Sequence, residues 1–195
     1  FLMDVSGSMS QDRKYLARSF FFLLYQFLNH RYERVEVVFI SHSTVAERVS
    51  EDDFFKVGTY GGTIISSALN KQIEIVDKEY HPNAWNIYTF YCGDGENWSS
   101  DNEKSLDLFK QIKDLSQLTA YCEINEHYGN FAEEGREEIA PSGYPWPSFS
   151  AWKNEELENL WSKLTPICDN KFKKVMVGHT DHIWKAFKQL FGGEK

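Results

Sequence analysis

The stretch Phe1-Leu2-Met3-Asp4-Val5-Ser6-Gly7-Ser8-Met9 decides how the rest of the chain is interpreted. It begins with apolar residues, as the end of a buried strand does, and then places Asp4, Ser6 and Ser8 on alternate positions. Gly7 allows the backbone to turn tightly between the two serines. One carboxylate and two hydroxyls at a strand tip are oxygen ligands that hard cations prefer, and Mg²⁺ takes them at ~2.0–2.1 Å. The stretch therefore indicates a strand end that can hold a divalent ion.

A long helix is predicted directly after this stretch, over residues about 10–31. Its apolar side chains recur at helical spacing: Tyr15, Leu16, Phe20, Leu23, Leu24, Phe27 and Leu28. A strand feeding a helix in this way places the loop between them at the carboxyl edge of a sheet. The alternative for the loop is purely structural, with Ser10 or Asp12 capping the helix.

A second loop carries Thr63 after two glycines, Gly61 and Gly62, and the helical run of residues 64–80 follows. The glycines allow the backbone to approach another loop closely, so the Thr63 hydroxyl can face a metal ion. The alternative is an ordinary helix N-cap at Thr63.

A third loop carries Asp94 between Gly93 and Gly95, at the end of the strand-like run of residues 86–92. An Asp in this position is either a turn residue or a ligand carboxylate exposed by its small neighbours. Asp4 and Asp94 thus follow predicted strands, and Thr63 precedes a predicted helix. This is the order that the ligands of one shared site would have.

The remaining pattern alternates strands and helices. Strands are predicted at residues 35–40, 44–49, 118–124 and 172–177, with a tight turn at 41–43, and helices at 101–115, 155–164 and 182–191. This alternation predicts a doubly wound α/β fold: a mainly parallel six-stranded sheet with one antiparallel edge strand and helices on both faces. We expect a single domain over residues 1–195, with an irregular elaboration at about 125–150, belonging to a longer protein.

The charge and composition of the chain limit the classes of partner that we expect. The 195 residues include 21 Lys plus Arg and 29 Asp plus Glu, for a formal charge of -8. Such a surface repels phosphates, so nucleic acid and anionic membranes are not expected partners. No apolar run reaches the ~18–20 residues that span a bilayer. Cys92, Cys122 and Cys168 form no Cys-x-x-Cys pair, and we expect a cytoplasmic protein with reduced thiols, Cys92 and Cys122 being neighbours in the sheet.

The three fragments resemble the metal-ion-dependent adhesion site (MIDAS) of von Willebrand factor A (vWA) domains. That resemblance implies Asp4, Ser6, Ser8, Thr63 and Asp94 as ligands of Mg²⁺ (or Mn²⁺ or Ca²⁺), and a strand order of 3-2-1-4-5-6 with the third strand antiparallel. The runs Lys14–Phe22 and Asn86–Glu103 further resemble the YhbH/YeaH family of bacterial proteins, associated with sporulation and stress. Members of that family are encoded beside a serine protein kinase with an AAA+-like module, which implies a kinase or ATPase partner.

The expected function is therefore a non-enzymatic, metal-dependent protein-binding module. A carboxylate of the partner would complete the coordination of the ion. Trp98 would either add apolar contact at the rim of the site or pack in the core. The alternative is a Mg²⁺-dependent phosphoryl-transfer or other hydrolytic enzyme using the same edge. Ser6 stands where a second carboxylate of an Asp-x-Asp site would be, and no Gly-x-x-x-x-Gly-Lys-Ser/Thr loop exists.

One further motif is ambiguous. His179-Thr180-Asp181-His182 offers several transition-metal ligands within four residues. The favoured interpretation is a loop in which Thr180 or Asp181 caps the last helix.

Overall fold

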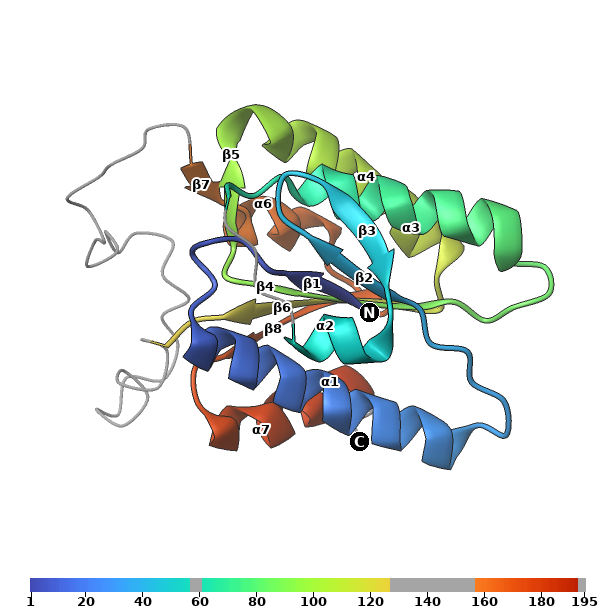
Figure 1. The fold of residues 1–195 in the computed structure, drawn as a ribbon. Helices are drawn as coiled ribbons and strands as arrows, with labels where there is room; N and C mark the ends of the chain where they lie inside the picture. The colour runs from blue at the N-terminus through green and yellow to red at the C-terminus, as the bar shows by residue number, and fades with distance from the viewer. Residues whose placement is uncertain (57–60, 127–156, 193–195) are drawn as a thin grey trace.

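A six-stranded sheet forms the centre of the computed structural model, which describes residues 1–56, 61–126 and 157–192 (Figure 1). Its order is β3-β2-β1-β4-β6-β8. The bounds are β1 Leu2–Asp4, β2 Phe39–His42, β3 Ala46–Val49, β4 Tyr88–Gly93, β6 Leu118–Ile124 and β8 Phe172–Val177. All neighbours pair in parallel except β3, which is antiparallel to β2 at the edge. Numbered by their order of appearance, these strands run 3-2-1-4-5-6, so the predicted fold class is confirmed.

Helices cover both faces of the sheet (Figure 1). On one face lie α1 (Gln11–Arg31), α2 (Glu51–Lys56) and α7 (Thr180–Phe191); on the other lie α3 (Ile65–Glu79), α4 (Asn102–Leu115) and α6 (Trp161–Leu164). Side chains alternate between the faces along each strand. Met3 therefore packs in the α1 core and Leu2 in the α3 core.

The long helix α1 begins as predicted, because Ser10 caps it: its Oγ accepts the backbone N–H of Arg13 at 3.2 Å. Cys92 and Cys122 are register partners on β4 and β6, as expected. All three cysteines of the chain are free thiols.

The strand predicted at residues 35–40 is displaced. β2 spans Phe39–His42, so Ser41 and His42, expected in a turn, continue the parallel ladder opposite Met3 and Asp4. The buried His42 is tolerated there because its Nε2 lies 3.2 Å from the hydroxyl of Tyr91. The edge strand is correspondingly shorter than the predicted 44–49.

The helix predicted at residues 155–164 is wrong in its first half. Leu157–Asn159 form a short strand, β7, which pairs antiparallel with β5 (Glu96–Trp98). The helix starts only at Trp161, whose N–H is accepted by Asn159 Oδ1 at 2.7 Å, and runs into a 3-10 turn at Thr165–Ile167. Leu160 and Leu164 are buried as expected, but apolar spacing alone did not reveal the β5–β7 pair or helix α2.

The last helix, α7, starts earlier than predicted and uses a different cap. His179 is its N-cap, and its Nδ1 accepts the N–H of Asp181 at 3.4 Å. The expected capping by Thr180 or Asp181 is therefore wrong. Of the irregular elaboration predicted at about 125–150, residues 127–150 lie outside the described residues.

Candidate metal centre

The three predicted loops meet at the carboxyl edge of the sheet. The first and second loops are joined by a backbone hydrogen bond from Gly7 N–H to Gly61 O at 3.1 Å. The second and third are joined by one from Trp98 N–H to Thr63 O at 3.4 Å. Among the predicted ligands, Ser8 is partly buried, and the others are buried: Asp4, Ser6, Thr63 and Asp94. The sequence fragments thus come from separate loops of one edge.

Asp4 is fully buried, and only one of its carboxylate oxygens has a hydrogen-bond partner. Its Oδ1 accepts the Ser6 N–H at 2.8 Å, whereas its Oδ2 is buried without a hydrogen-bond partner. Ser6 Oγ and Ser8 Oγ lie 3.1 Å apart, as a hydroxyl pair next to this carboxyl group. Burial, and then the nearby charge of Asp94, raise the pKa of Asp4 from 3.8 to about 8. In the absence of a bound cation, this raised pKa favours the protonated form of Asp4 at neutral pH.

Asp94 is already engaged on both oxygens. Its Oδ1 accepts the Glu96 N–H at 3.1 Å, and its Oδ2 accepts from Arg13 Nη1 at 3.1 Å. Arg13 also donates to Ser8 O at 3.1 Å, and its Nε lies 3.2 Å from Glu126 Oε1. Neither Arg13 nor Glu126 was predicted as a site residue, because they lie far apart in the sequence and match no motif.

Gly93 makes room at the centre of the site. A Cβ at this position would lie 3.1 Å from Cβ of Asp4 and 2.7 Å from the hydroxyl of Tyr91. The end of β4 therefore approaches the end of β1 only because residue 93 has no side chain.

Thr63 is not the cap of α3. The N-cap position is Ile64, which offers no side-chain acceptor. The first N–H groups of the helix are satisfied from the third loop instead: Ile65 N–H donates to Asn97 Oδ1 and Ser66 N–H to Asp101 Oδ2, both at 3.0 Å. The structural alternative for Thr63 is thus wrong, and the loop holding it is fixed by strand β5 and the 3-10 turn that follow Asp94.

We expect Asp101→Ala to destabilise the fold strongly. Asp101 Oδ2 also accepts from Ser105 Oγ at 2.8 Å, so the change leaves the buried Ser66 N–H and Ser105 hydroxyl without this acceptor. The expected loss is about 2–4 kcal/mol of unfolding free energy, measured by urea denaturation in EDTA. Asp107→Ala is the matched control on α4, since its ion pair with Lys110 is exposed. Equal stability of the two variants would contradict the capping role.

Trp98 lies beside the second loop. Its side chain is partly buried, and a Cβ on Gly62 would lie 2.7 Å from its Nε1, so the indole packs directly on the Gly62 backbone. Nε1 is buried without a hydrogen-bond partner. The two apolar cores described above do not include this ring. This placement favours the rim over the core.

Glu123 is a buried acid that the sequence analysis did not single out. It follows Cys122 at the end of β6, pairs in register with Gly93, and accepts from Asn159 Nδ2 at 3.3 Å. Burial raises its pKa from 4.5 to about 8. The available signal was its position as the charged residue within an otherwise uncharged strand, residues 118–124.

The candidate donors at this edge are all oxygen atoms, which would suit a hard cation if one binds there. Within residues 1–56, 61–126 and 157–192, no group of three or more His, Cys, Asp or Glu side chains could hold a metal. The candidate set instead combines two carboxylates with three hydroxyls. The unpaired, buried Asp4 Oδ2 fits a cation, and the engaged oxygens of Asp94 fit contact through water.

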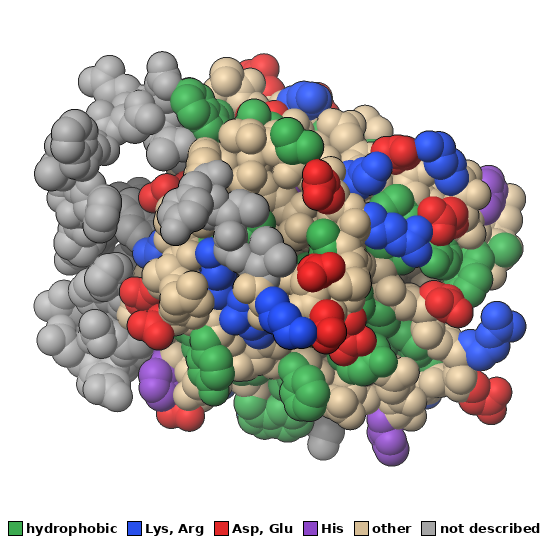
Figure 2. Space-filling model, viewed as in Figure 1, with side chains coloured by type: hydrophobic (Ala, Val, Ile, Leu, Met, Phe, Trp, Pro, Cys, Tyr) green, Lys and Arg blue, Asp and Glu red, His purple; other side chains and the backbone are tan. Residues whose placement is uncertain are grey.

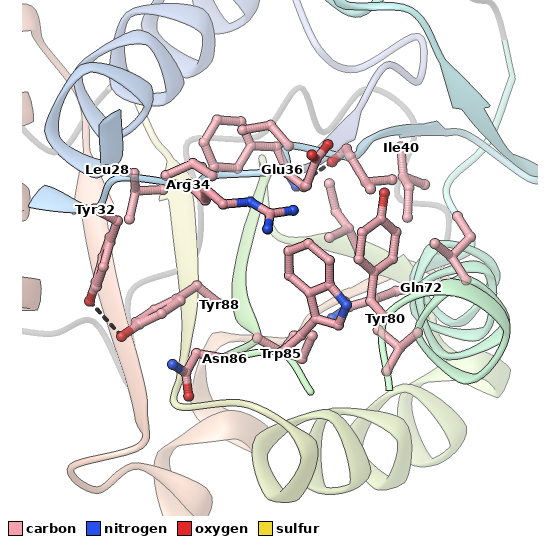
Figure 3. A pocket seen from close by; sticks show the side chains of 18 of the residues that line it. Leu28, Tyr32, Arg34, Glu36, Ile40, Gln72, Tyr80, Trp85, Asn86 and Tyr88 are labelled. Atoms are coloured by element: carbon pink, nitrogen blue, oxygen red, sulfur yellow. Dashed lines mark hydrogen bonds between the residues drawn. The ribbon is translucent and has the colours of Figure 1, made fainter. Parts of the chain in front are cut away.

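A cavity of about 290 Å³ lies at the opposite, amino edge of the sheet. Figure 3 shows Arg34, Tyr80 and Trp85 extending into it, with the Tyr32 and Tyr88 hydroxyls joined at 2.7 Å. None of the five predicted ligands lines this cavity. It is therefore a feature separate from the candidate metal centre.

The strand order, the antiparallel edge and the helices on both faces define a vWA-like α/β fold. An aerotolerance-related membrane protein from Bacteroides fragilis, solved with multiple mutations to serines, has this arrangement with a TM-score of 0.56. The match covers 98% of this chain and 97% of that one at 13% identity, and shows the fold alone. The chain belongs to the family described as "Protein of unknown function (DUF444)", which matches residues 1–194.

Bacterial relatives agree with this assignment. A UPF0229 protein of Clostridium perfringens is 40% identical over 194 residues, and one of Ruminiclostridium cellulolyticum is 50% identical over 189 residues. These matches cover 100% and 97% of this chain, but only 43% and 42% of the relatives. The resemblance to YeaH-like proteins is thus confirmed at the level of the family, and the family match includes residues 125–150.

Helices in the described part of the chain are all too short or too polar to cross a membrane.

Proposed function

We propose that this domain is a non-enzymatic, divalent-cation-dependent protein-binding module. The observation that carries the proposal is the buried Asp4 Oδ2, which has no partner although it lies at the edge where two serine hydroxyls and Asp94 converge. A buried polar atom of this kind is costly unless a proton or a cation satisfies it. Mg²⁺ suits the oxygen donors, and Mn²⁺ or Ca²⁺ are the other candidates.

Asp4, Ser6, Ser8 and Thr63 would hold the ion, and Asp94 would support it through water. When bound, the ion would supply an electrophilic position for an acidic side chain of a partner. The acidic balance of the chain, -8 overall, supplies no long-range attraction for such a partner. The attraction must therefore be local.

The resemblance to YhbH/YeaH proteins suggests a serine protein kinase or an AAA+ ATPase as the first partner to test. Immobilised wild-type protein should retain that partner in Mg²⁺ and release it in EDTA, and Asp4→Asn should not retain it in either buffer. Equal retention in all these conditions would refute the proposal. Hydrolysis of a generic phosphate ester that requires Mg²⁺ and Asp4 would instead support the enzymatic alternative.

We expect Trp98→Ala to weaken partner binding in Mg²⁺ without unfolding the domain. The indole packs beside the Gly62–Thr63 loop rather than in the described cores, so its loss should remove rim contact worth ~1–3 kcal/mol of binding free energy. Titration calorimetry with the captured partner measures this. Trp184→Ala is the control, because Trp184 is 55% exposed on α7. A stability loss of about 3–5 kcal/mol without weaker binding would place Trp98 in the core instead.

A further inference from the structure

Helix α1 carries two basic side chains, Lys14 and Arg18, whose charges the described residues leave unbalanced. Lys14 is only 5% exposed and Arg18 is partly buried, with its Nε enclosed and without a hydrogen-bond partner. Neither side chain forms an ion pair within 4.0 Å with any acid in the described part of the chain. Arg13, on the same helix, is in contrast paired with both Asp94 and Glu126.

Leaving these two charges together is unfavourable. The carbon stem of Lys14 is packed in the protein, whereas its Nζ is not among the described nitrogen and oxygen atoms that are enclosed without a partner. Burial first, and then the nearby charge of Arg18, lower the pKa of Lys14. Burial lowers the pKa of Arg18 as well. An arrangement that stability alone disfavours calls for a ligand that offsets it.

The position of the pair is set by helical spacing. Lys14 and Arg18 are one turn apart on one stripe of α1, which continues to Phe21. The ring of Phe21 packs on Phe54 of α2, with centroids 5.2 Å apart. The two cations therefore lie on the side of α1 that faces α2, in the half of the helix that starts at the candidate metal centre. Figure 2 shows several Lys and Arg side chains near the start of α1 and beside α2, with Asp and Glu side chains next to them.

Nearby acids do not supply the missing charge. Asp4 is the acid whose field favours the charged form of Lys14, but it lies beyond ion-pair distance. With a cation bound, its charge would be directed to the ion. Helix α2 carries three acids, of which Asp52 pairs with Lys56 and Asp53 accepts from Ser50, and none of the three forms an ion pair with Lys14 or Arg18.

We infer that Lys14 and Arg18 form an oxyanion subsite beside the candidate metal centre, which takes a phosphate or carboxylate group carried by a peptide segment of the partner. The arginine fork can bind two oxygens of such a group, and the lysine adds a compact charge. The subsite needs no metal, so it can exist even if the proposed cation site does not. If both exist, the partner segment presents two acidic groups, one to each.

The test uses the whole 195-residue chain in EDTA, with inorganic phosphate and succinate as separate probes against chloride of equal ionic strength. Phosphate stabilises many proteins by exclusion from their surfaces, so the readout is the difference between wild type and variants. We expect one or both probes to raise the melting temperature of wild type by about 3 °C more than that of Arg18→Gln or Lys14→Met. Arg48→Gln, which removes an exposed ion pair with Glu79, should respond like wild type.

The two probes distinguish the sources of the oxyanion. A response to phosphate alone assigns the subsite to a phosphorylated side chain, and a response to succinate as well assigns it to Asp or Glu. Lys14→Met should also melt higher than wild type without any probe, since it removes a cation that partial burial and the nearby charge of Arg18 disfavour. If Lys14→Met does not fold, Arg18→Gln decides alone. Equal responses of wild type and Arg18→Gln to both probes would overturn the inference.

Discussion

In EDTA, the protein is expected to melt at progressively lower temperatures as the pH is raised from 5 to 9. The pKa of Asp4 is raised by burial from 3.8 to about 8, so the folded state binds a proton that the unfolded state has already released. The contribution of this proton to the free energy of unfolding is fully present below about pH 4 and is lost as the pH rises through about 8. For Asp4 the loss is on the order of 3–5 kcal/mol. Glu123, with a pKa raised to about 8, changes stability in the same direction.

Mg²⁺ should remove the part of this decline that belongs to Asp4, because a bound cation favours the ionised carboxylate. The measurement is a set of thermal melts across pH, in EDTA and in Mg²⁺. Asp4→Asn should flatten the decline in EDTA and abolish the effect of Mg²⁺. Glu123→Gln should flatten only its own part and leave the Mg²⁺ effect intact. A wild-type melting temperature that is independent of pH in EDTA would contradict the burial argument.

Asp4→Asn should also abolish divalent-ion binding while leaving the domain folded. The amide keeps the shape of the side chain and its acceptor for the Ser6 N–H at 2.8 Å, but it removes the negative charge. The apolar cores remain untouched, so the far-ultraviolet circular dichroism should not change. We expect the affinity for Mg²⁺ or Mn²⁺ to fall by a factor of about 100 or more, measured by titration calorimetry at pH 8.

Asp12→Asn is the matched control for this substitution. Asp12 lies in the first turn of α1 and is exposed. Asp12→Asn therefore removes one negative charge from the same region without changing a candidate ligand. Its affinity for the ion should stay within a few-fold of wild type. Comparable binding by wild type and Asp4→Asn would mean that the ion, if any, lies elsewhere.

The parts of the fold that followed from sequence are those with strong local periodicity. Residues 118–124 and 172–177 were predicted with their observed ends, because each is a short, mostly apolar run bounded by a break. Helix α1 was predicted from the spacing of its apolar residues, and Ser10, one of the two caps considered in the structural alternative, is its N-cap. The loops of Asp4, Thr63 and Asp94 could be placed at one edge because parallel strands share the direction of their ends.

The parts that were missed depend on partners far along the chain. Leu157–Asn159 is a strand only because Glu96–Trp98 lies beside it, and helical spacing at Leu157, Leu160 and Leu164 concealed this pairing. The ion pair of Arg13 with Asp94 joins residues 81 positions apart. The cap of α3 comes from Asn97 and Asp101, in a run quoted only for its family likeness. Local propensity contains none of this information.

Arg13 pairs with two acids, so a change at one of them can affect the other. Its guanidinium contacts Asp94 Oδ2 at 3.1 Å and Glu126 Oε1 at 3.2 Å, and Glu126 in turn accepts from Ser10 Oγ at 2.9 Å. If a cation moves Asp94 away from Arg13, Arg13 stays paired with Glu126. If another contact moves Glu126 away, Arg13 stays paired with Asp94. Because binding free energies are reciprocal, each event must change the affinity of the other by the same factor. If the proposed ion binds, contacts at Glu126, just beyond the end of β6, would therefore be coupled to ion binding through Arg13.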